Sequence, residues 1–132
     1  MTTLEVLVRT IGISHLLQPP LTLVLSRTLG LRDAFSQLAE LPRRMAVVMG
    51  MTCVALPTGM GVLIAAYAAG VFRPGLPETL CVLAGVFWTL RLLVQVFWYS
   101  ALFPRDARHW HWILCLIFAV QGPGLLVVVG TG

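Results

Sequence analysis

Charged side chains are scarce in this sequence. They make up 11% of its 132 residues, against the roughly 25% that is usual in soluble domains. Lysine is missing, so all nine basic residues are arginines, whereas apolar residues reach 58% and the mean hydropathy is +0.91. A soluble domain of this size exposes too much surface to be covered by so few polar groups. The composition therefore excludes a soluble enzyme, a disordered tail and a nucleic-acid-binding module, and it predicts an integral membrane protein.

Cysteine and the familiar catalytic motifs are also rare or missing. Cys53, Cys81 and Cys115 each lie inside an apolar stretch, their number is odd, and no C-x-x-C spacing occurs. This pattern predicts small buried side chains and no disulfide framework or zinc site. There is no G-x-S-x-G, no H-E-x-x-H and no phosphate loop, and no acid lies deep inside an apolar stretch. We therefore expect a protein that is not an enzyme and holds no metal.

Apolar stretches of membrane-crossing length occur four times. Crossing about 30 Å of hydrocarbon takes about 20 residues of helix, and four strands could not close a barrel in lipid. The first stretch has Glu5 where a signal peptide would have basic residues, so we expect it to be a mature span. No repeat divides residues 1–132, so the predicted fold is a single all-α domain, a four-helix membrane bundle with proline-kinked helices. The expected spans cover residues 4–25, 45–72, 79–103 and 110–129.

The arginines predict how this bundle is oriented. Four arginines lie in the first connection and two in the third, whereas the second connection holds only Arg73. Basic residues favour the cytoplasmic side, so both termini should lie outside the cytoplasm. The exclusive use of arginine over lysine is typical of a GC-rich bacterial genome, and we expect a bacterial inner (cytoplasmic) membrane. The six arginines of the first and third connections are Arg27, Arg32, Arg43, Arg44, Arg105 and Arg108.

The first connection, residues 30–41, is longer than a turn. Leu31, Phe35 and Leu38 recur at helical spacing, and polar residues fall on the opposite face. This pattern predicts a short amphipathic helix that lies in the membrane interface. An ordinary connector packed against the protein explains the pattern equally well.

Arg91 stands near the centre of the third expected span. A central arginine costs about 2.5–3.5 kcal/mol on insertion scales, so it should face protein or water and have partners. No acid is available at that depth, but a proline inside a helix frees the carbonyl four residues before it. We therefore expect Arg91 to meet such carbonyls. The prolines concerned are Pro19, Pro20, Pro57 and Pro123.

Polar side chains at helical spacing extend this prediction to a polar node at the bilayer midplane. Two faces should point inward, one through Arg91, Gln95 and Tyr99 and one through His15 and Gln18. Three interpretations stay open: a site for a lipid head group, quinone carbonyl or small solute, a purely structural network, or pairing of Arg91 with an acid of another subunit. The expected node consists of Arg91, Gln95, Gln18, Gln121, His15 and Tyr99.

The histidines and the small residues allow further predictions. His15 could ligate haem or a chlorin, although a hydrogen-bonded core histidine is the more common role of a single histidine in a span. His111 begins the fourth span, where an interfacial role is expected. Gly61, Ala65 and Ala69 recur every four residues, a spacing that lets membrane helices approach closely. These three residues are expected to form a tight helix contact, within the chain or with another chain.

The small size of the chain and its lack of catalytic motifs together suggest a function. Because almost nothing lies outside the bilayer, interactions should occur laterally, with membrane lipid, other membrane subunits or further copies of this chain. We expect a non-catalytic subunit or structural partner of a larger membrane assembly. The alternative is a small carrier or ligand-binding membrane protein that uses a midplane site around Arg91.

Overall fold

The computed structural model describes all 132 residues, and they form helices with no β-strand. This confirms the predicted all-α class. Three helical segments are long and apolar enough to cross a membrane: Glu40–Ala66, Leu76–Tyr99 and Arg105–Thr131. They overlap the expected spans 45–72, 79–103 and 110–129, and the largest difference is that the first of them ends at Ala66 and not at residue 72. The seven α-helices are α1 (Thr3–Ser14), α2 (Gln18–Thr28), α3 (Leu31–Ser36), α4 (Glu40–Ala66), α5 (Leu76–Val94), α6 (Arg108–Ala119) and α7 (Leu125–Thr131).

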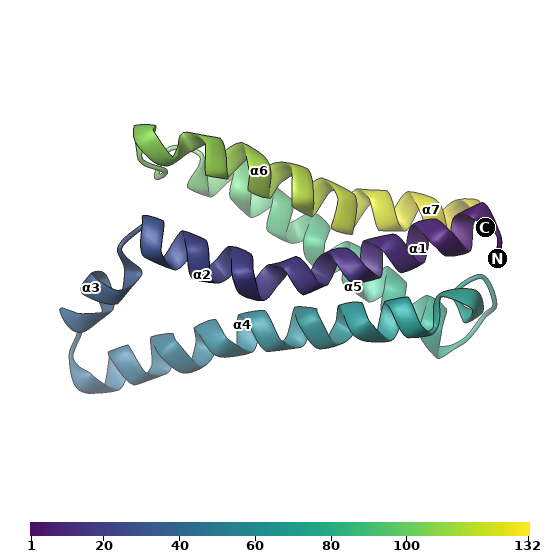
Figure 1. Cartoon of the computed structure of the whole chain (residues 1–132), viewed down its shortest axis with the longest axis horizontal. Coiled ribbons are helices and arrows are strands. Elements are labelled where there is room, and N and C mark those ends of the chain that lie inside the picture. The colour runs from purple at the N-terminus through teal and green to yellow at the C-terminus, as the bar shows by residue number, and fades with distance from the viewer.

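The first apolar stretch is divided. A capping box between Thr2 and Glu5 begins α1, and a 3-10 turn at His15–Leu17 separates α1 from α2 just before Pro19 and Pro20. Neither helix reaches the length of a span alone, because they have 12 and 11 residues. Together they nevertheless form one rod that runs along α4 (Figure 1).

Prolines affect the helices unequally. The π-helix Val120–Gly124 contains Pro123 and joins α6 to α7, whereas Pro57 lies inside α4 without dividing it. A second π-helix, Gln95–Tyr99, extends α5. Proline lacks the N–H of a regular turn, and 3-10 or π geometry can re-pair the freed carbonyl locally. The helix type thus changes near Pro19 and at Pro123 but not at Pro57.

The first connection is shorter in structure than the sequence pattern predicted. Gly30 adopts a left-handed conformation with φ of 64°, which ends the preceding helix, and α3 covers only Leu31–Ser36. Leu41 already belongs to α4 and is 69% exposed. Proline is tolerated in a first helical turn, so Pro42 allows a new helix to begin at Glu40. The amphipathic helix predicted over residues 30–41 is therefore too long, since α3 ends at Ser36 and Glu40 already begins the next helix.

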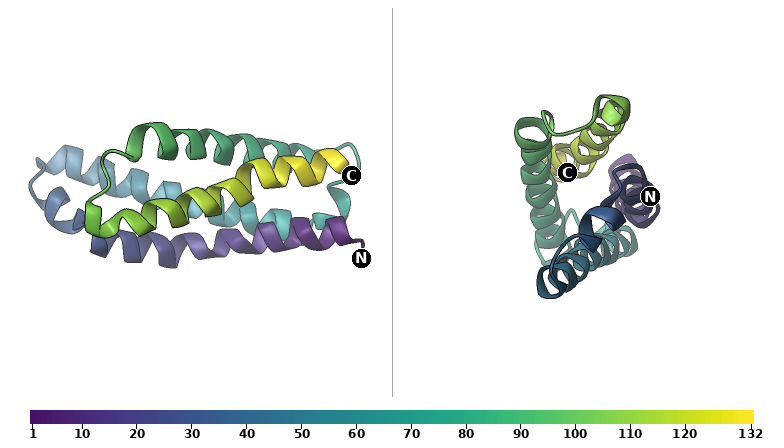
Figure 2. Two further views of the ribbon diagram at one scale, coloured as in Figure 1. Left: turned by 90° about the horizontal axis from the view of Figure 1, so that it is seen from above. Right: turned by 90° about the vertical axis from the view of Figure 1, so that its left-hand side faces the viewer.

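The helices lie side by side, and the packing is closer at one end. Both termini and the connection between α4 and α5 lie at one end, and the other two connections lie at the opposite end (Figure 1). Figure 2 shows the elongated shape and the spread of the helices when the latter end faces the viewer. The larger buried cluster lies toward the termini and the smaller one toward the arginine-rich end. The larger cluster comprises Val8, Ile11, Ile64, Ala68, Val71, Cys81, Ala84 and Leu125, and the smaller one comprises Trp88, Leu114 and Phe118.

Close packing of α1 on α4 depends on glycine. A Cβ on Gly61 would lie 2.2 Å from the Cβ of His15, and a Cβ on Gly12 would lie 2.7 Å from the backbone nitrogen of Ala65. The two backbones can therefore approach only because these side chains are missing. Ala69 lies beyond α4, in the 3-10 turn Ala68–Gly70, and it is exposed. Of the three predicted packing residues, Gly61 and Ala65 lie at the helix contact and Ala69 does not.

Candidate functional site

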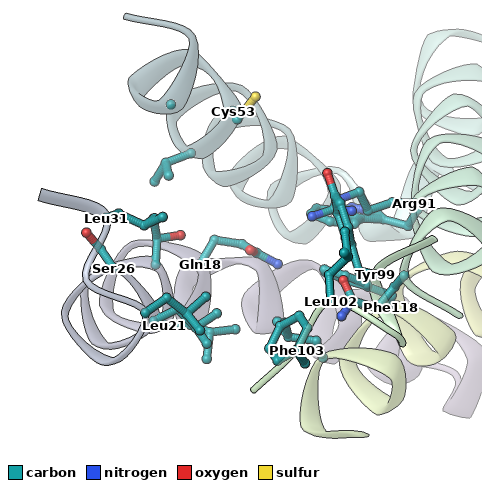
Figure 3. Close-up of a pocket in the computed structure, with 18 of the residues that line it drawn as sticks. Gln18, Leu21, Ser26, Leu31, Cys53, Arg91, Tyr99, Leu102, Phe103 and Phe118 are labelled. Carbon is teal, nitrogen blue, oxygen red and sulfur yellow. The ribbon is translucent and has the colours of Figure 1, made fainter. Parts of the chain in front are cut away.

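A cavity of about 560 Å³ occupies the open part of the bundle (Figure 3). Its walls come from α2, α4, α5 and α6, with contributions from α3 and from the segment after Tyr99. Most lining side chains are apolar, such as Leu21, Leu25, Leu114 and Phe118. Along α2 the lining extends from Gln18 to Leu29, about 16 Å at the rise of an α-helix. The cavity therefore leads from the middle of the bundle toward its arginine-rich end.

Two rows of polar side chains line this cavity. One row runs along α2 at four-residue intervals, and the other runs along α5 and the π-helix that extends it. The sequence predicted that both faces point inward, and the fold turns both toward the same space. The rows consist of Gln18, Thr22 and Ser26 on α2, and of Arg91, Gln95 and Tyr99 on the other side.

Arg91 carries the only charge of the cavity wall. Its guanidinium carbon lies 5.0 Å from the centre of the Tyr99 ring and 5.3 Å from that of Phe118. It donates no hydrogen bond to any group of the chain, so the predicted contact with freed carbonyls is wrong. At least one of these carbonyls is re-paired locally, since that of His15 accepts the N–H of Gln18 within the 3-10 turn. The rings provide cation–π attraction, but the N–H donors of Arg91 stay available to a partner from outside the chain.

The side-chain amides of Gln18 and Gln121 form a hydrogen bond with each other and none with Arg91. Nε2 of Gln18 donates to Oε1 of Gln121 at 3.1 Å, and Nε2 of Gln121 donates to the Ser14 hydroxyl at 3.2 Å. Ser14 in turn donates to the carbonyl of Ile11 at 2.6 Å. Gln121 is completely buried. This network joins the N-terminal rod to the π-helix Val120–Gly124 and does not include Arg91.

His15 is buried and fully hydrogen-bonded. Nε1 of Trp88 donates to Nε2 of His15 at 2.8 Å, and Nδ1 of His15 lies 2.8 Å from the carbonyl oxygen of Ile11. Because the indole N–H can only donate, Nε2 must accept, and the ring proton is on Nδ1. No lone pair is then free to ligate iron, and the chain has no cluster of three or more metal-ligating side chains. The haem or chlorin alternative at His15 therefore has no support in the geometry.

Trp88 separates this buried network from the cavity. Its ring stacks on Phe118, with centroids 5.1 Å apart and planes inclined by 21°. Phe118 also contacts the guanidinium of Arg91 on the cavity side. Trp88 is 3% exposed, lines the cavity and bonds to His15 behind it. Trp88 thus forms the floor of the cavity, and its hydrogen bond to His15 holds this floor against the 3-10 turn that follows α1.

Gln95 and His111 form a second buried pair. They are 1% and 2% exposed, and Nε2 of Gln95 lies 3.0 Å from Nδ1 of His111. The other ring nitrogen of His111 faces the sulfur of Cys115 at 3.7 Å. The sequence predicted an interfacial role for His111, and the structure adds that its side chain is buried inside the bundle near the start of α6. His111 shares a helix face with Leu114 and Phe118, a spacing that was available in the sequence, whereas His109 is exposed.

Hydroxyl groups on the cavity wall have no partner within the chain. Several other hydroxyls on the helices donate to the carbonyl four residues earlier. Thr22, Ser26 and Tyr99 line the cavity and make no such bond. These groups therefore remain available for hydrogen bonds inside the cavity. The helical hydroxyls that do bond their own backbone in this way include those of Thr10, Thr28, Thr52, Thr58 and Thr89.

Comparison with known proteins gives no further guide to this site. No protein-family model, no curated protein and no solved structure matches the chain. The function must therefore be argued from the cavity and its side chains.

Proposed function

We propose that the chain is a four-span membrane protein in which α1 and α2 together make the first span. Residues 3–28 measure about 39 Å as a helix, enough to cross a bilayer. The connections with six arginines lie at one end, opposite the termini (Figure 1). By the positive-inside rule that end is cytoplasmic, and a bacterial inner membrane with both termini outside the cytoplasm fits this distribution.

Within that membrane, we propose that the protein is a non-enzymatic carrier or binding protein for an amphiphile with an acidic head group. The observation that carries this proposal is Arg91, which faces the cavity and has no acceptor in its own chain. A guanidinium at such a depth needs an acceptor because its desolvation is costly. A phosphate or carboxylate of a ligand matches its fork of N–H donors.

The remaining walls suit the apolar part of such a molecule. A volume of about 560 Å³ lies within the roughly 300–1,000 Å³ usual for ligand sites, and such sites combine apolar walls with a few polar groups. Leu21, Leu25 and Leu114 provide apolar contact beside the polar rows. The head group would reach Arg91 from the arginine-rich end, along the free hydroxyls of Thr22 and Ser26.

Native mass spectrometry of protein purified in mild detergent tests this function. We expect wild type to retain an anionic lipid and Arg91→Ala to lose it, while circular dichroism shows unchanged helix content. Arg91→Lys should retain less lipid than wild type, since an ammonium cannot form the paired hydrogen bonds of a guanidinium. Arg73→Ala removes an exposed arginine of the second connection and is the matched control. Equal retention by wild type and Arg91→Ala would contradict the proposal.

A second candidate is a subunit of a larger membrane assembly. A groove of about 820 Å³ runs between α4 and α5, where no charged side chain lines it. Ala55, Gly59 and Leu83 form part of its wall, and small residues let a further helix approach closely. In that case another protein chain should appear in the same spectra. An acid of that chain would pair with Arg91, and Arg91→Ala would release the chain.

A further inference from the structure

We propose that the groove between α4 and α5 holds one acyl chain of the amphiphile whose acidic head group binds at Arg91. This inference rests on the proposed function and gives the orientation of its ligand. The acyl chain leaves the cavity beside Arg91 and runs along the groove toward the end of the bundle where the termini lie. The ligand class is therefore an anionic membrane lipid, and the groove of about 820 Å³ is its chain site.

The groove and the cavity adjoin each other. Cys53 of α4 and Phe87 of α5 line both spaces, and no other residue does so. Cys53 is exposed and Phe87 is 47% exposed, so neither side chain is fixed in a packed core. Exposed side chains change rotamer quickly, and these two can turn aside for a ligand. Phe87 precedes Arg91 by four residues, so the groove begins about one helical turn from the guanidinium.

The surface of the groove suits hydrocarbon. No charged side chain lines it, and its one hydroxyl, that of Thr52, already donates to the carbonyl of Val48 at 3.0 Å. Gly59 leaves open space in the wall, since nothing lies within 4 Å of its Cβ position. Such a surface offers dispersion contacts and no free hydrogen-bonding side chain. It therefore matches an acyl chain and not a head group.

The length and direction of the groove match one leaflet of a bilayer. From Cys53, where the groove meets the cavity, its lining on α4 extends to Leu63, about 15 Å at the rise of an α-helix. Half of a hydrocarbon core of about 30 Å has the same thickness. The α4 helix begins at the arginine-rich end, so the groove runs from Cys53 away from that end (Figure 1). A lipid of the leaflet at the arginine-rich end points its acyl chains in this direction.

The boundary between α4 and α5 lets a lipid enter from the side. Side-chain hydrogen bonds join the N-terminal rod to α5 and to the π-helix Val120–Gly124, but none joins α4 to α5. An acyl chain can therefore move between these two helices without breaking a hydrogen bond. A partner helix is a poorer match, because a span of about 30 Å is twice as long as the groove.

Photocrosslinking locates the acyl chain. Delipidated protein receives phosphatidylglycerol with a diazirine at the end of one acyl chain, and mass spectrometry of peptides maps the attachment after irradiation. We expect attachment within residues 56–63 and 80–83, and roughly tenfold less of it in Arg91→Ala, which loses a hydrogen bond to a charged group. Attachment within residues 21–29 would place the chain at the arginine-rich end and overturn the inference. Equal attachment in the groove of wild type and Arg91→Ala would show surrounding lipid only and would also overturn it.

Filling the groove should weaken lipid binding. Gly59→Leu places a side chain in the open space, and Leu83→Trp fills the groove from α5 if the first variant does not fold. Titration with dioleoyl phosphatidylglycerol, followed by native mass spectrometry, should show roughly 5- to 150-fold weaker binding, as expected for overpacking. Gly130→Leu and Leu90→Trp are the matched controls, because Gly130 also has open space and exposed Leu90 lies outside the groove. Unchanged affinity in a folded Gly59→Leu would refute the chain site.

A short-chain lipid separates the chain site from the head-group site. Gly59 follows Cys53 by six residues, about 9 Å along α4, and a hexanoyl chain ends before it. Dihexanoyl phosphatidylglycerol should therefore bind Gly59→Leu as well as it binds wild type, and Arg91→Ala should bind it less. Equal weakening of both lipids by Gly59→Leu would overturn the inference, since the Arg91 site would then be damaged.

Two further outcomes separate this inference from the proposed function. Equal lipid binding by wild type and Arg91→Ala would contradict the proposed function itself. Release of a bound protein chain by Gly59→Leu, with lipid binding unchanged, would assign the groove to a partner helix and overturn only the chain site.

Discussion

Trp88 donates a hydrogen bond to His15 at 2.8 Å, and this contact joins α5 to the N-terminal rod across 73 residues of sequence. Both side chains are buried, at 3% and 0% exposure. The bond fixes the protonated nitrogen of His15 and also the position of the cavity floor, because Trp88 stacks on Phe118. This pair of residues thus links the packing of the bundle near the termini to the position of the cavity floor toward the arginine-rich end.

Removal of the indole donor should destabilise the fold. Trp88→Phe leaves Nε2 of His15 buried without a partner, at a cost of about 1–3 kcal/mol. Thermal unfolding in detergent, followed by circular dichroism, should show a lower midpoint than wild type. Trp98→Phe is the control, since Trp98 is 71% exposed and should leave the midpoint unchanged. Equal midpoints for Trp88→Phe and wild type would show that the bond contributes nothing to stability.

A methyl group at Gly61 should separate α1 from α4. The added Cβ would lie 2.2 Å from the Cβ of His15, so one backbone must move, and overpacking of this kind costs about 1–3 kcal/mol. Gly59 lies in the same helix with open space around it, and Gly59→Ala should be tolerated. The measurement is the fraction of folded protein that elutes as a single species after mild heating. The prediction fails if Gly61→Ala and Gly59→Ala behave alike.

Gln18 and Gln121 should be energetically coupled. Their amides bond at 3.1 Å in a buried site, and hydrogen bonds between membrane helices average about 0.6 kcal/mol, with a maximum near 1.7. A double-mutant cycle with Gln18→Leu and Gln121→Leu measures this coupling from unfolding in mixed detergent. We expect the double variant to be less destabilised than the sum of the single variants. Strict additivity would mean that the two amides do not act as a pair.

Topology can be measured with single added cysteines. An impermeant maleimide applied to spheroplasts should label Thr131→Cys, near the C-terminus, and should label Ser36→Cys only after the membrane is opened. Wild type serves as the background, because its three cysteines lie on apolar helices and maleimide reacts with the thiolate. The opposite labelling pattern would reverse the proposed orientation and place the mouth of the cavity outside the cytoplasm.

Helical periodicity and composition were sufficient to predict much of this structure. The all-α class and three of the four expected spans followed from runs of apolar residues, since each span must satisfy its backbone internally. The polar rows through Gln18 and through Arg91 followed from side-chain spacing, because a helix places residues three and four apart on one face. These features depend only on neighbours in the sequence, so the sequence by itself determined them.

The pairing of the polar groups depended on the tertiary structure. His15 bonds to Trp88, Gln18 to Gln121 and Gln95 to His111, and in two of these pairs the partner was not predicted at all. Such bonds depend on the rotation and depth of each helix, and the π-helices at Gln95–Tyr99 and Val120–Gly124 alter that rotation locally. For the same reason only the fold shows that all but two buried side-chain polar atoms have a partner, and that Arg91 contacts aromatic rings and no acceptor of its own chain.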